Sequence, residues 1–75
     1  MPTLKDFGGF RIMMHIGDHN PPHVHVIAGA ERATVTIREG AVIAGRVHPK
    51  MLRRARAWIA ENRPALLVKW GQLQA

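Results

Sequence analysis

The sequence predicts an α+β fold, with a three- to four-stranded, mostly antiparallel meander sheet followed by two C-terminal helices packed on one face. Over much of the first 44 residues, apolar side chains alternate with polar ones, a period of two that is typical of half-buried strands. From Pro49 onwards the apolar period becomes 3.6, as in amphipathic helices. Strands followed by helices are the element order of α+β domains.

Four segments have the strand pattern, and short polar or glycine-containing segments separate them. The segments are 10–16, 23–27, 32–38 and 41–44. The first should place four apolar side chains on one face: Phe10, Ile12, Met14 and Ile16. Pro21 and Pro22 exclude helix from the first connection and favour an extended path. Glu39 and Gly40 predict a tight hairpin between the last two strands.

Two helices are predicted in the remainder of the chain. Pro49 suits the first turn of a helix, and Asn62, Arg63 and Pro64 end that helix and begin the next. The apolar stripe of the first consists of Met51, Leu52, Ala55, Trp58 and Ile59, and that of the second of Leu66, Leu67, Trp70 and Leu73. This spacing indicates that both tryptophans anchor the core and do not stack on bases.

The length of 75 residues allows one domain, spanning 1–75. Cysteine and serine are both absent, which excludes disulfides, thiolate zinc sites and serine or cysteine nucleophiles. No apolar segment has the length of a membrane span, and the N-terminus lacks the pattern of a signal peptide. We therefore expect a cytoplasmic protein with no membrane contact.

Positive charge is the main compositional signal. Eleven Lys and Arg oppose five Asp and Glu, for a net charge of +6, and eight of the eleven are arginine. A positive electrostatic potential attracts RNA, DNA or an acidic protein, although a net charge also keeps a small protein soluble. On the first helix Lys50, Arg53 and Arg54 form a candidate phosphate-binding face, with an ordinary solvated face as the alternative. Arg11 is one of several arginines in the strand region. These arginines could surround the face of the sheet that carries the strand histidines, which are described next.

The segment from Asp18 to Val26 holds three of the five histidines, His19, His23 and His25. Residues i and i+2 of a strand share a face about 6.5–7 Å apart, so His23 and His25 can converge on one group. His15 could face the same way from the preceding strand. We name His23, His25 and His19 as candidate catalytic residues, because histidine titrates near neutrality. Asp18 is a candidate binding residue.

Two other interpretations of this segment remain open. Imidazoles with a carboxylate are also a plausible ligand set for zinc, manganese or iron. Alternatively, Asp18 only caps the turn and His19 only holds the loop. No spacing here is as specific as a paired Cys-x-x-Cys, and we assign no metal ligand and no cofactor.

These residues together resemble the bacterial DUF4160 family over nearly the whole chain. The most specific part is the block Asp18-His19-Asn20-Pro21-Pro22-His23-Val24-His25-Val26, supported by the opening Met1-Pro2-Thr3, the hairpin at Gly40, the helix start at Pro49 and the two tryptophans. Val24 is a departure, since members commonly have an aromatic residue there. The resemblance implies a small bacterial cytoplasmic protein. Its gene would often lie beside one of the DUF2442 family, in pairs suspected of being toxin–antitoxin modules.

The sequence leaves the reaction open, including whether the protein is an enzyme. The first hypothesis is a component of a toxin–antitoxin-like pair that acts on or binds nucleic acid. The alternatives are a non-catalytic protein-binding module and a metal-binding domain built on the histidine block. A small core and an exposed sheet edge predict a partner chain, either a DUF2442-like protein or a second copy.

Overall fold

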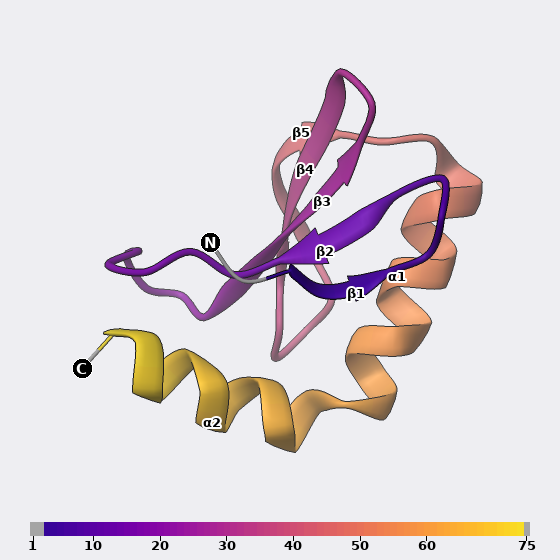
Figure 1. Ribbon diagram of the computed structural model, residues 1–75. Helices are drawn as coiled ribbons and strands as arrows, with labels where there is room; N and C mark the ends of the chain where they lie inside the picture. The colour runs from indigo at the N-terminus through magenta and orange to yellow at the C-terminus, as the bar shows by residue number, and fades with distance from the viewer. Residues whose placement is uncertain (1–2, 75) are drawn as a thin grey trace.

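The computed structural model describes residues 3–74, which form one antiparallel sheet followed by two helices (Figure 1). The elements are β1 (Thr3–Asp6), β2 (Arg11–Met13), β3 (His23–Ala28), β4 (Glu31–Thr36), β5 (Val42–Arg46), α1 (Pro49–Glu61) and α2 (Arg63–Gln74). The strands lie in chain order, so the sheet is a meander. The predicted α+β fold is confirmed, with five strands in place of three or four.

The additional strand is β1, which pairs with β2 along an edge of the sheet. Its residues are mostly polar and exposed, and only Leu4 is partly buried. An edge strand with so little buried surface shows no apolar alternation, so the sequence pattern could not reveal it. The first predicted strand was also too long: β2 ends at Met13, and Ile16 is 67% exposed in the following loop.

Tight turns and one close backbone approach set the register of the sheet. Gly29 and Ala30 connect β3 to β4, and Gly29 has a φ of +59°, which suits a two-residue hairpin. In β5, Gly45 has a φ of +69°, and a Cβ there would collide with the backbone oxygen of Arg32. Only glycine fits that position, so β4 and β5 depend on it for their close pairing.

One face of the sheet, here called the core face, packs against the helices. Its buried side chains include Ile12, Val24, Val26, Ala33 and Val35, which form one cluster with Ala55, Ile59, Leu66 and Trp70. Trp58 and four other helical side chains are partly buried against this cluster: Met51, Leu52, Leu67 and Leu73. The predicted apolar stripes and the core positions of both tryptophans are therefore confirmed. Val24 is fully buried, so its difference from the family pattern falls in the core.

Local contacts define the helix ends and attach the helices to the sheet. His48 caps α1 by accepting the Lys50 backbone N–H at its Nδ1, and Pro49 occupies the first turn as predicted. At the junction of the helices, Arg63 donates from Nε to the backbone oxygen of Ile37 at 2.8 Å. α2 then runs across one end of the sheet, next to the loop that connects β2 and β3 (Figure 1).

No helix in residues 3–74 has both the length and the apolar character that crossing a bilayer requires.

Candidate functional site

The face of the sheet opposite the core face carries the histidines, and we call it the histidine face. Paired residues of neighbouring strands share a face, so the register defines transverse rows of side chains. One row consists of Arg11, Ile27, Arg32 and Arg46, on β2 to β5. The next consists of Met13, His25, Thr34 and Ala44, and beyond it His23 pairs with Thr36. The row that carries the arginines is thus adjacent to the row of His25, and the buried His23 lies one row further on.

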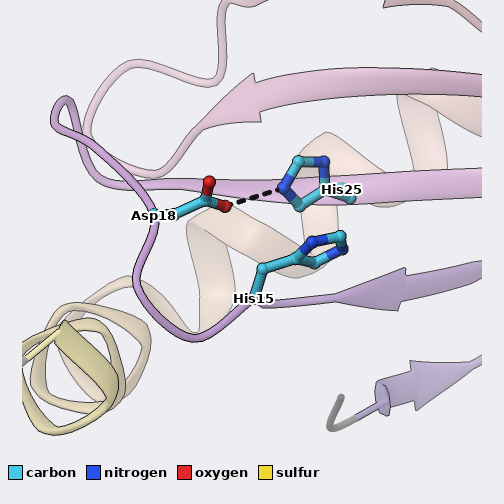
Figure 2. A group of neighbouring side chains, drawn as sticks. All are labelled: His15, Asp18 and His25. Atoms are coloured by element: carbon cyan, nitrogen blue, oxygen red, sulfur yellow. Dashed lines mark hydrogen bonds and ion pairs between the residues drawn. The ribbon is translucent and has the colours of Figure 1, made fainter.

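Asp18 is the centre of the group that we call the histidine cluster: His15, Asp18, His23 and His25. It lies in the loop between β2 and β3, and its side chain points back toward the strands (Figure 2). Its Oδ2 accepts hydrogen bonds from Nε2 of His23 and Nε2 of His25, both at 3.0 Å. The predicted convergence of the two strand histidines is real, and the group on which they converge is a carboxylate.

His23 is fully engaged by these contacts. Its Nδ1 lies 2.7 Å from the backbone oxygen of Pro21, while its Nε2 contacts Asp18. Each ring nitrogen therefore lies within hydrogen-bond distance of an oxygen. The ring is buried against Trp70, with 5.0 Å between the ring centroids. His23 therefore has no nitrogen left for a ligand or for proton transfer and serves to hold Asp18 in place.

His15 joins the cluster from the end of β2 without a hydrogen bond to it. Its ring lies beside that of His25, with centroids 3.9 Å apart and planes at 35° (Figure 2). Within residues 3–74, its buried Nε2 has no hydrogen-bond partner. A buried polar atom without a partner is uncommon in native structures and calls for an explanation.

The environment shifts the acidity of two members of the cluster. The hydrogen bond from His25, together with the field of His23, lowers the pKa of Asp18 despite the opposing effect of burial. Burial lowers the pKa of His15, and the neighbouring His25 and His23 add to this against the attraction of Asp18. At neutral pH, Asp18 is thus a carboxylate and His15 an uncharged imidazole.

Three members of the cluster could hold a metal ion. Ligand atoms of His15, Asp18 and His25 all lie within 4.8 Å of one another. His15 and Asp18 lie in the loop between β2 and β3, and His25 lies in β3, so the loop that contains the two prolines brings them together. The Asn20–Pro21 peptide bond in that loop is cis.

Not every residue singled out from the sequence belongs to this site. His19 is exposed, although it lies next to Asp18 in the chain. His15, for which the prediction was only conditional, is part of the cluster. The strand period indicated this, since positions 11, 13 and 15 fall on the same face.

The candidate cations of α1 belong to a different element from the histidine cluster, and all three are exposed. The guanidinium of Arg54 lies over the rings of Phe7 and Phe10, 5.2 and 5.6 Å from their centroids. Arg53 lines an open hollow of about 430 Å³ with Val47, Pro49, Leu52 and Arg56. Lys50 is exposed at the start of the helix. Lys50, Arg53 and Arg54 are exposed at neighbouring positions of α1, and their role in binding phosphate stays a prediction.

Two residues of α2 that the sequence did not link to the site contact its edge. Trp70 packs on His23, and Gln74 donates from Nε2 to the backbone oxygen of His15 at 2.9 Å. These contacts join residues up to 59 positions apart, and they depend on how α2 docks. No periodicity or motif could have revealed them.

The fold and site together define a small α+β domain, a meander sheet with two helices, that carries a histidine–aspartate cluster at one end. The family model described as "Domain of unknown function (DUF4160)" matches residues 9–71. The chain belongs to the DUF4160 family, as the sequence resemblance predicted. No curated protein and no solved structure matches the chain significantly.

Proposed function

We propose that this protein binds single-stranded nucleic acid on the histidine face, as a cytoplasmic component of a toxin–antitoxin-like gene pair. One observation carries the binding proposal. Arg11, Arg32 and Arg46 lie in one row of the sheet, all three exposed, in the row next to His25. We call these three residues the arginine row.

The dimensions of the arginine row suit an extended polyanion. Strands are about 4.8 Å apart, so a row from β2 to β5 spans about 14 Å. Ile27 occupies the β3 position of the row, and His25 is two residues before it on the same face. A nucleic acid backbone lying along the row would therefore pass about 7 Å from the row of His25.

The arginine row keeps most of its hydrogen-bond donors for phosphate: among residues 3–74, its one side-chain hydrogen bond is from Nε of Arg11 to Sδ of Met13 at 3.3 Å. Among residues 3–74, the ion pairs are those of Asp18 with His23 and His25, so none involves an arginine. Asp6 is opposite Arg11 on β1, but its Oδ1 accepts the backbone N–H of Gly8 at 2.8 Å. An unpaired guanidinium offers a planar fork of donors that matches phosphate oxygens.

The hydrogen bonds of the histidine cluster indicate which of the three candidate catalytic histidines has a ring nitrogen available. His23 uses both ring nitrogens internally, and His19 is exposed in the loop beside the cluster. His25 keeps Nδ1 unbonded among residues 3–74 and is in the row next to the arginines. If the bound nucleic acid is also cleaved, His25 is the residue that we expect to transfer a proton.

A matched pair of triple variants tests the proposal by fluorescence anisotropy with single-stranded RNA and DNA. Variant one is Arg11→Gln, Arg32→Gln and Arg46→Gln. Variant two carries the same change of charge elsewhere: Arg38→Gln, Lys50→Gln and Arg53→Gln. If each arginine of the row contacts one phosphate, the slope of log affinity against log salt falls by about 2 in variant one only, at about 0.7 per contact.

Three results would contradict this proposal. Equal losses in the two variants would indicate attraction by net charge alone. A loss confined to the second would move the binding surface to α1 and the β4–β5 turn. Undetectable binding of wild-type protein at low salt would remove nucleic acid as the ligand. Analysis of the same oligonucleotides after incubation separates binding from cleavage.

The exposed edge of β5 supports the expectation of a partner chain. All five residues of this strand are exposed, including Val42 at 40% and Ile43 at 52%. An edge strand with apolar side chains and unpaired backbone groups is a template for pairing with another chain. We propose that this edge pairs with a second copy or with a DUF2442-like companion.

Light scattering tests the pairing and identifies the partner. The purified chain alone gives a dimer mass if the partner is a second copy, and a monomer mass if it is the companion. Co-expression with the neighbouring gene then gives a complex, which Ile43→Lys disrupts. If the wild-type chain has the mass of a monomer both alone and after co-expression with the companion, pairing at β5 is contradicted.

A further inference from the structure

The histidine cluster offers a metal site whose existence does not depend on nucleic acid binding. We propose that His15, Asp18 and His25 bind one divalent transition-metal ion of the zinc class. Two imidazoles with one carboxylate suit zinc, iron, copper or nickel, while magnesium and calcium prefer oxygen ligands. No cysteine is needed for such a site, and the chain has none.

The separation of two ligands already matches a metal site. Nε2 of His25 lies 3.0 Å from Oδ2 of Asp18. Ligand atoms about 2.1 Å from one metal ion are about 3.4 Å apart at the tetrahedral angle and about 3.0 Å apart at a right angle. A metal ion can therefore replace the proton that His25 shares with Asp18, with a change of only a few tenths of an ångström.

His15 supplies the third ligand. A ligand atom of His15 lies within 4.8 Å of one ligand atom each of Asp18 and His25. His15 is outside the strand ladder, so its side chain can close on the metal without breaking sheet pairing. Metal coordination would also give its buried, unpartnered Nε2 a partner.

The remaining residue of the cluster positions the carboxylate. His23 donates to Asp18 and is itself held by the backbone oxygen of Pro21 and by Trp70. Outer partners of this kind orient metal ligands and typically contribute about 10–100-fold to metal affinity. Three protein ligands leave at least one coordination position open for water or a substrate group.

A cobalt titration tests the site in the full chain. Metal-free protein is titrated with Co²⁺, whose visible absorption reports coordination, and Zn²⁺ is then added as a competitor. We expect one equivalent of Co²⁺ to bind and Zn²⁺ to displace it. His15→Gln removes a ligand while leaving both hydrogen bonds of Asp18 in place, so the variant should fold and lose binding. His23→Gln should bind one equivalent about 10–100-fold more weakly.

His19→Gln is the matched control, because it removes an exposed imidazole from the same loop. It should bind Co²⁺ like the wild type. Absence of binding at a tenfold excess of metal would overturn the proposal, as would undiminished binding by His15→Gln. Equal losses in His15→Gln and His19→Gln would also overturn it, since surface histidines would then hold the metal.

Nitrogen NMR of the histidine rings gives a second measurement that does not depend on any variant. Zn²⁺ should shift one ring nitrogen each of His15 and His25 strongly, and neither nitrogen of His23 should show the shift of a metal ligand. A zinc-induced change confined to the exposed His19 and His48 would contradict the site.

Discussion

The arginine row and the histidine cluster lie on the same face of one sheet, but their polar groups are partnered in opposite ways. In the cluster, one oxygen of Asp18 accepts two imidazoles, and His23 uses both of its nitrogens. In the arginine row, three exposed guanidiniums have no carboxylate partner among residues 3–74. Partnered polar groups stabilise a fold, and unpartnered ones at a surface are available to ligands. The cluster should therefore govern stability and the row should govern affinity.

Asp18→Ala should have the largest effect on stability. It removes the acceptor of two hydrogen bonds from partly buried imidazoles, and hydrogen bonds to charged groups contribute about 1.5–3 kcal/mol. We expect the free energy of unfolding in metal-free buffer to fall by about 2–3 kcal/mol, measured by denaturation with urea. A loss below about 0.5 kcal/mol, the range of ordinary surface substitutions, would show that the cluster does not support the fold.

Acidification should destabilise the metal-free protein through His15 and Asp18. Both groups have a pKa below their ordinary values of 6.5 and 3.8, so the unfolded chain binds protons more readily than the folded one. The stability that His15 contributes is present above pH 6.5 and is lost as the pH falls through its folded pKa. The Asp18 contribution is lost in the same direction, below pH 3.8.

Thermal unfolding between pH 7.5 and pH 5 measures the His15 part of this dependence. His15→Gln should have a shallower slope of melting temperature against pH than the wild type. Identical slopes would mean that His15 is not shielded from protonation in the folded chain.

Arg32→Ala should separate the arginine row from the cluster. Arg32 is exposed in β4 and pairs with Arg46 on β5. We expect stability to change by less than about 0.5 kcal/mol, because the side chain makes no ion pair with any residue in 3–74. Affinity for single-stranded RNA should fall, with a salt slope lower by about 0.7. Unfolding and anisotropy measurements on one preparation test both, and unchanged affinity would contradict the proposed role of the row.

His19→Gln should have the smallest effect. This residue is exposed and is the one histidine of the Asp18-to-Val26 segment outside the cluster. Stability should stay within about 0.5 kcal/mol of wild type, and nucleic acid affinity should not change. A marked effect in either urea denaturation or anisotropy would extend the functional surface along the loop.

The sequence predicted the parts of this arrangement that depend on local period. Alternation placed His23 and His25 on one face, and the 3.6-residue period located both helices and their buried stripes. The short edge strand β1 has one partly buried residue and could not be detected by alternation. The contact of Arg54 with Phe7 and Phe10 could not be predicted either, since it depends on tertiary packing.

The candidate site shows the same limit. The strand period indicated His15 as a member, and the block around the two prolines marked Asp18. Sequence alone could not distinguish the engaged His23 from the more available His25, because the difference is the hydrogen bond from His23 to Pro21. Nor could it align Arg32 with Arg46, which depends on how β4 pairs with β5.

Chemical-shift mapping with single-stranded RNA tests most directly whether the histidine face is the functional surface. Amide signals of ¹⁵N-labelled protein are recorded during the titration. The largest changes should occur at the arginine row and around His25, on β2, β3, β4 and β5, while α1 should change little. Changes concentrated on α1 around Lys50 and Arg53, or none at all at low salt, would contradict it.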